Sequence, residues 1–357
     1  MAQDHHAHLW PGVPMAVGAA VLFGVATPFS KILLGTVNPQ LLAGLLYLGA
    51  GIGLAGVHFG RGAIGIPTVE APLRRPDFPW LAAVILFGGV IGPLLLMLGL
   101  ARVEAAPASL LLNLEGLATM GVAWLVFREN VDRRLLLGAF AILAGAAVLS
   151  WNGQHFAIPG GAAYIAAACV AWGIDNNLTR KLSFADPVVT AMIKGLAAGV
   201  VNVAVALLAG ARIPPGGTLF AAAALGFLAI GVSLVLFVLA LRHLGTARTG
   251  AYFSLAPFIG AAVAILALDE VVGPSFAIAG LLMGIGVWLH LTERHEHEHT
   301  HEPLEHEHVH THDAHHQHAH DGPVTEPHSH SHRHRPMRHK HVHYPDLHHR
   351  HPHAPGQ

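Results

Sequence analysis

Charged residues are scarce in this 357-residue chain, and their scarcity excludes most soluble folds. Asp, Glu, Lys and Arg make up 11% of the sequence, whereas an ordinary soluble domain carries about 25%. Several windows have no charge over the roughly 20 residues that cross the hydrocarbon core of a bilayer, among them 40–59, 80–100 and 217–241. With 53% hydrophobic residues, the chain is predicted to cross a membrane several times.

Three further absences narrow the class of function. A single cysteine, Cys169, excludes an intramolecular disulfide and a CxxC metal or redox site. A formal net charge of −1 gives no support for binding nucleic acid. No nucleotide-binding motif is present, so ATP-driven pumping is not expected, and nothing indicates an enzyme or a required cofactor.

Hydropathy and helix-breaking residues divide the chain into ten candidate spans. The N-terminus lacks a basic region before its first apolar run, so Val13 onward is interpreted as a span and not as a cleaved signal. The ten spans are 13–34, 40–59, 80–100, 106–127, 135–151, 161–181, 187–210, 217–241, 249–268 and 276–291. We therefore expect an all-α membrane protein of ten transmembrane helices.

Lys and Arg in the short loops predict the orientation. Ten of these basic residues fall in the connections on one side and three on the other. Because positive loops stay on the cytoplasmic side, both termini are predicted to be cytoplasmic, in an inner (plasma) membrane.

The two halves of the chain resemble each other. "FGVATPFSK" (23–31) corresponds to "WGIDNNLTRK" (172–181), which pairs Lys31 with Arg180. "LLLNLEGLATMGVAWLVFRE" (110–129) corresponds to 251–270, and both segments end on Glu. Five helices is an odd number, so the second half is expected to be inserted upside down relative to the first. The predicted domains are 13–151, 161–291 and a tail, 292–357.

This pattern resembles the drug/metabolite transporter superfamily, and within it the EamA-type family. The resemblance rests on five-plus-five helices, an aromatic-Gly pair followed by a cation, and an acidic residue closing each fourth helix. It implies an inverted repeat with the substrate site near the bilayer midplane. One departure is clear: the proline often found at the centre of the fourth helix is present as Pro257, but the first half has Gly116 there.

Glu115 is the most unusual residue of the fourth predicted span. An ionised carboxylate at the bilayer centre costs at least about 2.5–3.5 kcal/mol, so Glu115 should face the bundle interior and be protonated, paired or hydrated. Asn113 precedes it by two residues. We interpret Glu115 as part of a substrate and proton path; the alternative is a protonated carboxyl that locks two helices together.

A second polar group interrupts the sixth and seventh spans. Asp175, Asn176 and Asn177 are consecutive, and consecutive helical residues point about 100° apart, so a single helix contact cannot hide them all. Thr179 lies one turn beyond Asp175, and Lys194 is expected at the same depth on the next helix. We predict that Asp175 and Lys194 pair; otherwise Lys194 extends its ammonium to the interface.

Lys31 and Arg180 occupy equivalent repeat positions and, by the inversion, opposite membrane faces. They could act as symmetric gates, but ordinary helix-end anchoring is favoured.

The tail changes composition abruptly at residue 292. It holds 23 of the 30 histidines, few aliphatic residues and several prolines, so it is expected to be disordered. Imidazole suits Zn, Ni, Co and Cu, and alternation with acidic residues offers many labile sites; a solubilising or pH-responsive tail is the alternative. The expected ligands are His295, His297, His299, His301, His306, His308, His310, His312, His315 and His316.

Three functions compete on the sequence alone. The favoured one is a secondary transporter of a small polar or cationic solute, coupled to protons, whose tail senses metal. The second is a transporter of a divalent metal or a metal chelate, and the third a membrane-anchored metal store. The lipid bilayer and a small molecule or metal ion are the expected partners, and the oligomeric state stays open, with a homodimer as one option.

Overall fold

The computed structural model describes residues 12–64, 73–127, 133–151, 160–179, 182 and 186–292, together with four short tail segments. The helices are α1 (Gly12–Gly24), α2 (Ala26–Leu34), α3 (Pro39–Ala63), α4 (Phe78–Val84), α5 (Gly92–Leu100), α6 (Ala105–Leu111), α7 (Leu114–Phe127), α8 (Arg133–Leu149), α9 (Gly160–Thr179), α10 (Pro187–Leu208), α11 (Gly216–Gly226), α12 (Ser233–Phe253), α13 (Ala256–Ala267) and α14 (Pro274–Leu291). A 3₁₀ turn, η2 (Arg75–Asp77), precedes α4, and two π-helical segments, η3 (Ile85–Ile91) and η5 (Phe227–Val232), interrupt longer helices.

Eight helical stretches of the described residues are long and apolar enough to cross a membrane. They are Gly12–Leu34, Pro39–Ala63, Arg75–Leu100, Ala105–Val126, Pro187–Leu208, Gly216–Ala240, Thr249–Ala267 and Pro274–Leu291. The other two predicted spans correspond to α8, which has 17 residues, and to α9, which carries the Asp-Asn-Asn sequence. The multi-pass character predicted from hydropathy is therefore present.

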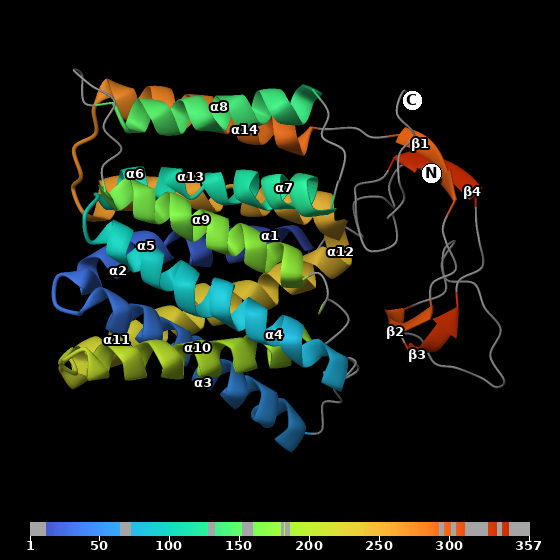
Figure 1. Cartoon of the computed structure of the whole chain (residues 1–357), viewed down its shortest axis with the longest axis horizontal. Coiled ribbons are helices and arrows are strands. Elements are labelled where there is room, and N and C mark those ends of the chain that lie inside the picture. Colours follow the sequence, from blue (N-terminus) through green and yellow to red (C-terminus); the bar gives the residue numbers. More distant parts are fainter. Residues whose placement is uncertain are drawn as a thin grey trace.

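Glycine permits the closest helix contacts of the bundle. Along the α3–α10 crossing, a methyl group added at Gly51 or Gly195 would strike the backbone of the other helix. Gly138 of α8 and Gly286 of α14 approach each other in the same way. Small residues let backbones approach where lipid supplies no hydrophobic drive between helices. Figure 1 shows α8 and α14 side by side at one edge of the bundle, with α3, α10 and α11 at the opposite edge.

Prolines explain several breaks in the long helices. Proline has no N–H and its ring displaces the carbonyl four residues earlier. Pro28 accordingly coincides with the break at Val25 between α1 and α2, and Pro257 with the break at Ser254–Leu255 between α12 and α13. The helical backbone is continuous through residues 241–248, which lie between the two candidate spans Gly216–Ala240 and Thr249–Ala267.

The break between α6 and α7 has no proline. Asn113 instead turns its side-chain amide back onto Leu110 O, at 2.9 Å. At the equivalent break of the second half, the Ser254 hydroxyl donates to Ala251 O at 2.8 Å. These two bonds occupy matching positions in the sequence correspondence of the halves. The fourth span of the first half is therefore interrupted although Gly116 replaces the expected proline.

The tail was expected to be disordered, but its described segments form four strands. They are β1 (Glu296–Thr300), β2 (Glu305–His310), β3 (His328–Arg333) and β4 (Arg338–Val342). β1 pairs with β4 and β2 with β3, both antiparallel. The register sets Glu298 opposite Lys340 and Glu305 opposite Arg333, and opposite charges directly across an antiparallel pair favour pairing.

The predicted metal ligands divide between these strands and the rest of the tail. Those within strands are His297, His299, His306, His308 and His310. Those outside the described residues are His295, His301, His312, His315 and His316.

Candidate functional site

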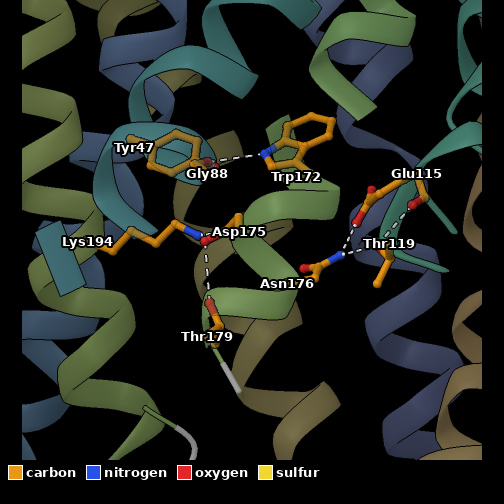
Figure 2. Close-up of polar contacts among 9 residues, drawn as sticks. All are labelled: Tyr47, Gly88, Glu115, Thr119, Trp172, Asp175, Asn176, Thr179 and Lys194. Carbon is orange, nitrogen blue, oxygen red and sulfur yellow. Dashed lines mark hydrogen bonds and ion pairs between the residues drawn. The ribbon is translucent and has the colours of Figure 1, made fainter. Parts of the chain in front are cut away.

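Two polar clusters lie on different sides of α9, as Figure 2 shows. Asp175 and Asn176 are consecutive, so the helix directs their side chains about 100° apart. Asp175 is buried, whereas Asn176 is exposed. The first cluster joins α9 to α10, and the second joins α9 to α7.

The first cluster is an ion pair. Lys194 Nζ of α10 lies 2.5 Å from Asp175 Oδ2, and the two side chains are 18% and 7% exposed. The Thr179 hydroxyl donates to Asp175 Oδ1 at 3.3 Å. The pairing predicted for Asp175 and Lys194 is confirmed, so each buried charge has an opposite charge beside it.

The ion pair depends on a glycine of η3. This segment packs against both α9 and α10. A methyl group added to Gly88 would overlap the Asp175 carboxylate. Only a residue without a side chain leaves room for the carboxylate to reach Lys194 past η3.

The π-helical form of η3 exposes a carbonyl that other helices use. In this segment the Gly92 N–H bonds five residues back, to Phe87 O. The same pattern would offer Gly88 O the N–H of residue 93, but Pro93 has none. Gly88 O instead accepts from the Tyr47 hydroxyl at 2.7 Å and from Trp172 Nε1 at 3.1 Å (Figure 2).

The second cluster centres on the Glu115 carboxylate. Asn176 Nδ2 donates to Glu115 Oε1 at 3.0 Å and to Thr119 Oγ1 at 3.1 Å (Figure 2). The Thr119 hydroxyl donates in turn to Glu115 O at 2.9 Å. Across the part of the chain that the structure describes, Glu115 has no cation within ion-pair distance. It therefore differs from Asp175, whose charge is balanced.

The break at Leu112–Asn113 places Glu115 in the first turn of α7. The N-terminus of a helix carries a partial positive charge, so this position suits a carboxylate better than the interior of an unbroken span would. A discontinuous membrane helix that directs such an end at a solute site is a recurring feature of secondary transporters.

The two remaining amides predicted for this site lie differently. Asn177 is buried and donates to Thr119 O at 2.9 Å and to Gly173 O at 2.8 Å. Its Oδ1 is buried without a hydrogen-bond partner. Asn113 faces Leu110 O and, at 3.9 Å, Met283 Sδ, and makes no bond to Glu115. The structure therefore joins Asn177 to the second cluster and leaves Asn113 as a residue of the helix break.

Burial changes sharply at the α6–α7 break. Six of the seven residues of α6 are buried. Of residues 114–126, all described, only Ala123 is buried. A methyl group added at Gly116 or Gly121 would meet no atom within 4 Å. One half of this span is thus enclosed by neighbouring helices, and the residues of the other half are, apart from Ala123, partly or fully exposed.

Side chains from distant parts of the chain form hydrogen bonds to the backbone near the start of α6, at the enclosed end of this span. Lys31 Nζ donates to Leu100 O and Val103 O, both at 2.7 Å. Glu270 accepts the backbone N–H groups of Ala105 and Ala106, both at 2.7 Å, at the start of α6. Lys31 therefore makes the contacts of an anchor. Arg180, its predicted counterpart, lies outside the described residues.

Sequence reasoning missed several members of these clusters. Thr119 follows Glu115 by one helical turn, and that spacing was the available signal. Trp172, Tyr47 and Gly88 were not among the predicted site residues, and Pro93 was the available signal for a backbone carbonyl without its helical donor. Among the described residues, no three His, Cys, Asp or Glu side chains meet as a metal site.

Comparison with known proteins agrees with this architecture. The EamA-like transporter family model matches residues 10–151 and 159–292. An uncharacterized transporter of Methanothermobacter thermautotrophicus is 30% identical over 296 residues, 79% of this chain and 86% of that protein. A "probable terminal-alkyne amino-acid exporter" of Streptantibioticus cattleyicolor is 26% identical over 250 residues, 67% of this chain and 84% of that protein.

A solved crystal structure shares the fold. It superposes with a TM-score of 0.58 at 20% identity and covers 78% of this chain and 96% of its own. The apolar helices and the family match over both halves identify the chain as a multi-pass membrane protein that belongs to the EamA-like transporter family.

Proposed function

We propose that this chain is a secondary transporter that exports a small polar solute in exchange for protons bound at Glu115. The single observation that carries the proposal is the charge of the second cluster. Glu115 lies within a candidate membrane span, is partly exposed, and has an amide and no cation as its described side-chain partner. A carboxylate in this setting needs a proton or a solute to balance its charge.

Each contact of the second cluster has a part in such an exchange. The Asn176 amide holds one oxygen of Glu115, and Thr119 holds the amide in place from the next turn of α7. The Asp175–Lys194 pair keeps the neighbouring face of α9 electrically neutral. Glu115 is then the group whose charge changes when a proton leaves and a solute arrives.

The wider architecture supports a transporter of this kind. Ten helices in two inverted five-helix halves, 13–151 and 161–291, would let the site open to either side in turn. Separate family matches over the two halves support this division. The name of one relative supports the proposed direction of export, and the basic loops support cytoplasmic termini. A "probable amino-acid metabolite efflux pump" of Salmonella typhimurium is 28% identical over 184 residues, 48% of this chain and 54% of that protein.

Reconstituted vesicles test the proposal. Purified protein is placed in proteoliposomes that enclose a pH-sensitive dye, and small polar solutes are added outside, with protein-free vesicles as the correction for passive permeation. We expect solute-dependent proton movement that Glu115→Gln abolishes and that Glu104→Gln, on an exposed connection, leaves intact. Proton movement that persists in Glu115→Gln would refute the role of Glu115.

The tail supports a second, metal-linked function. β1 and β4 place His297 opposite His341 and His299 opposite His339. β2 and β3 place three further histidine pairs in register, from His306↔His332 to His310↔His328. The backbone register thus brings histidine positions from distant parts of the tail next to each other. Imidazole is a ligand that suits Zn, Ni, Co or Cu.

We infer that metal on the tail regulates the transporter, with transport of a divalent metal or chelate as the alternative. The absence of a described His or Cys cluster in the bundle favours regulation. Cells that lack the gene are compared with cells that express the full chain and with cells that express residues 1–291 alone. Regulation predicts that metal changes solute export in cells with the full chain only. A metal cargo predicts that loss of the gene alters tolerance to nickel, cobalt, zinc or copper.

A further inference from the structure

The hydrogen-bonding groups around Glu115 indicate which solute charge the site accepts, an inference that rests on the proposed transport function. The donors of the second cluster are already used. Both printed bonds of Asn176 come from its Nδ2, to Glu115 and to Thr119, and the Thr119 hydroxyl donates to Glu115 O. Asn177 Nδ2 likewise serves Thr119 O and Gly173 O.

The acceptors of the same cluster remain available. In the described part of the chain, Glu115 Oε2 and Asn176 Oδ1 have no hydrogen-bond partner. Asn177 Oδ1 is buried and unpartnered, on a residue that is 2% exposed. An amide or carboxylate oxygen accepts and cannot donate. The cluster therefore suits a ligand rich in N–H donors and offers little to a ligand carboxylate.

The lysines of the described spans are engaged elsewhere. Lys194 is paired with Asp175, and Lys31 binds two carbonyl oxygens at the enclosed end of the bundle. The local charges of Glu115, Asp175 and Lys194 sum to one negative charge. A solute with a single positive charge neutralises this sum, whereas a zwitterion brings a carboxylate that has no described cation to meet it.

The described chain leaves part of the second cluster uncovered. Gly116 follows Glu115 directly and is exposed, and a methyl group added there would meet no atom within 4 Å. Asn176, whose amide binds the Glu115 carboxylate, is exposed as well, and Glu115 itself is partly exposed.

From this inventory of donors, acceptors and charges we propose that the Glu115 site selects monocationic amines without a free carboxylate over zwitterionic amino acids. An ammonium group carries three N–H donors and no acceptor, which matches the free Glu115 and Asn176 oxygens. Two relatives are named as a probable exporter of a terminal-alkyne amino acid and a probable efflux pump for amino-acid metabolites. The proposed preference for amines distinguishes this chain from an exporter of zwitterionic amino acids.

Equilibrium binding to the purified full chain tests the preference directly. Titration calorimetry at neutral pH compares leucinamide, leucine and 4-methylpentanoate, which share a side chain and differ in charge. Glycinamide with glycine, and tyrosinamide with tyrosine, repeat the comparison at other sizes. We expect the amides to bind at least about tenfold more tightly than the parent amino acids, and the carboxylic acid not to bind.

Variants separate the roles of the charges. Glu115→Gln should abolish the preference for amides, whereas Glu104→Gln removes a carboxylate from an exposed connection and should preserve it. Thermal unfolding of each variant shows whether it is folded before its binding is compared.

The possible failures of this experiment can be told apart. Equal binding of leucine and leucinamide, or no binding of any amide, overturns the proposed selectivity. Amide binding that survives Glu115→Gln overturns the assigned site. Amides that bind through Glu115 but drive no proton movement in vesicles overturn the proton-coupled function and leave the selectivity standing.

Discussion

At the residue scale, two membrane carboxylates beside α9 differ in how their charge is balanced. Asp175 of α9 is buried and balanced by Lys194, in a space that exists because residue 88 is glycine. Glu115 of α7 is partly exposed and has an amide of α9 as its partner. A buried pair that loses one partner leaves an uncompensated charge, so the first cluster is a structural element and the second is the chemically open one.

The first prediction concerns Gly88. Gly88→Ala should destabilise the protein by about 1–3 kcal/mol because its methyl group displaces the Asp175 carboxylate from Lys194. Gly60→Ala on α3 is the control, since a methyl group there meets no atom within 4 Å. Helix propensity alone favours Ala at both positions by roughly 0.5–1 kcal/mol. Thermal unfolding in detergent should show opposite shifts; two upward shifts would contradict the contact.

At the element scale, broken helices decide where polar groups can lie. The π-helical η3 exposes Gly88 O to two donors, and the α6–α7 break gives Glu115 the N-terminal turn of a helix. π-helical segments within α-helices occur frequently at functional sites. Each irregular element therefore contributes to the site: η3 supplies a free backbone carbonyl, and the α6–α7 break supplies the positive end of a helix dipole.

The second prediction tests the shared carbonyl of η3. Tyr47→Phe or Trp172→Phe alone removes one of the two described side-chain donors to Gly88 O, and the double variant removes both. An unsatisfied buried group costs about 1–3 kcal/mol. The double variant should therefore lose more stability than the sum of the single variants, measured as a double-mutant cycle on unfolding free energy. Simple additivity would show that the two bonds are independent.

The third prediction concerns the cap that starts α6. Glu270 binds the backbone N–H groups of Ala105 and Ala106 from a loop that follows α13. Glu270→Ala should lower the unfolding free energy by about 1–2 kcal/mol, as loss of an N-terminal cap does. Glu104→Ala is a matched control, because Glu104 precedes the same helix and its side chain makes no capping bond. Equal losses in both variants would argue against the cap.

At the scale of the whole molecule, the chain joins an apolar bundle to a histidine-rich tail. The family match ends at residue 292, where the tail begins. The four described strands of the tail form two sheets of their own, β1 with β4 and β2 with β3. The bundle should therefore fold without the tail.

The fourth prediction removes the tail. A chain that ends at Leu291 should keep the thermal stability of the bundle and lose most binding of zinc or nickel, because 23 of the 30 histidines lie beyond that point. Isothermal titration with each metal measures the ions bound by the full and shortened chains. Unchanged metal binding in the shortened chain would assign the metal to the bundle.

The sequence alone was sufficient to predict which segments lie in the membrane and where the polar tail begins. Uncharged stretches of membrane length predict membrane spans whatever their neighbours are, because the cost of burying charge in lipid is local. The multi-pass character and the family resemblance are confirmed. The separation of the tail at residue 292 follows from its composition, although its described strands, paired across up to 46 residues between Glu296 and Val342, were not foreseen.

Only the tertiary structure decided which polar residues meet. Equal depth on neighbouring spans predicted the Asp175–Lys194 pair, but the space for it comes from Gly88 on a third helix. Asn113 and Glu115 are two residues apart and have different partners. Asn113 lies in the break between α6 and α7 and bonds back to Leu110 O, whereas Glu115 lies in the first turn of α7 and bonds to Asn176. Hydropathy is a sum over adjacent residues, whereas hydrogen bonds depend on the approach of distant backbones, and the sequence does not encode that approach locally.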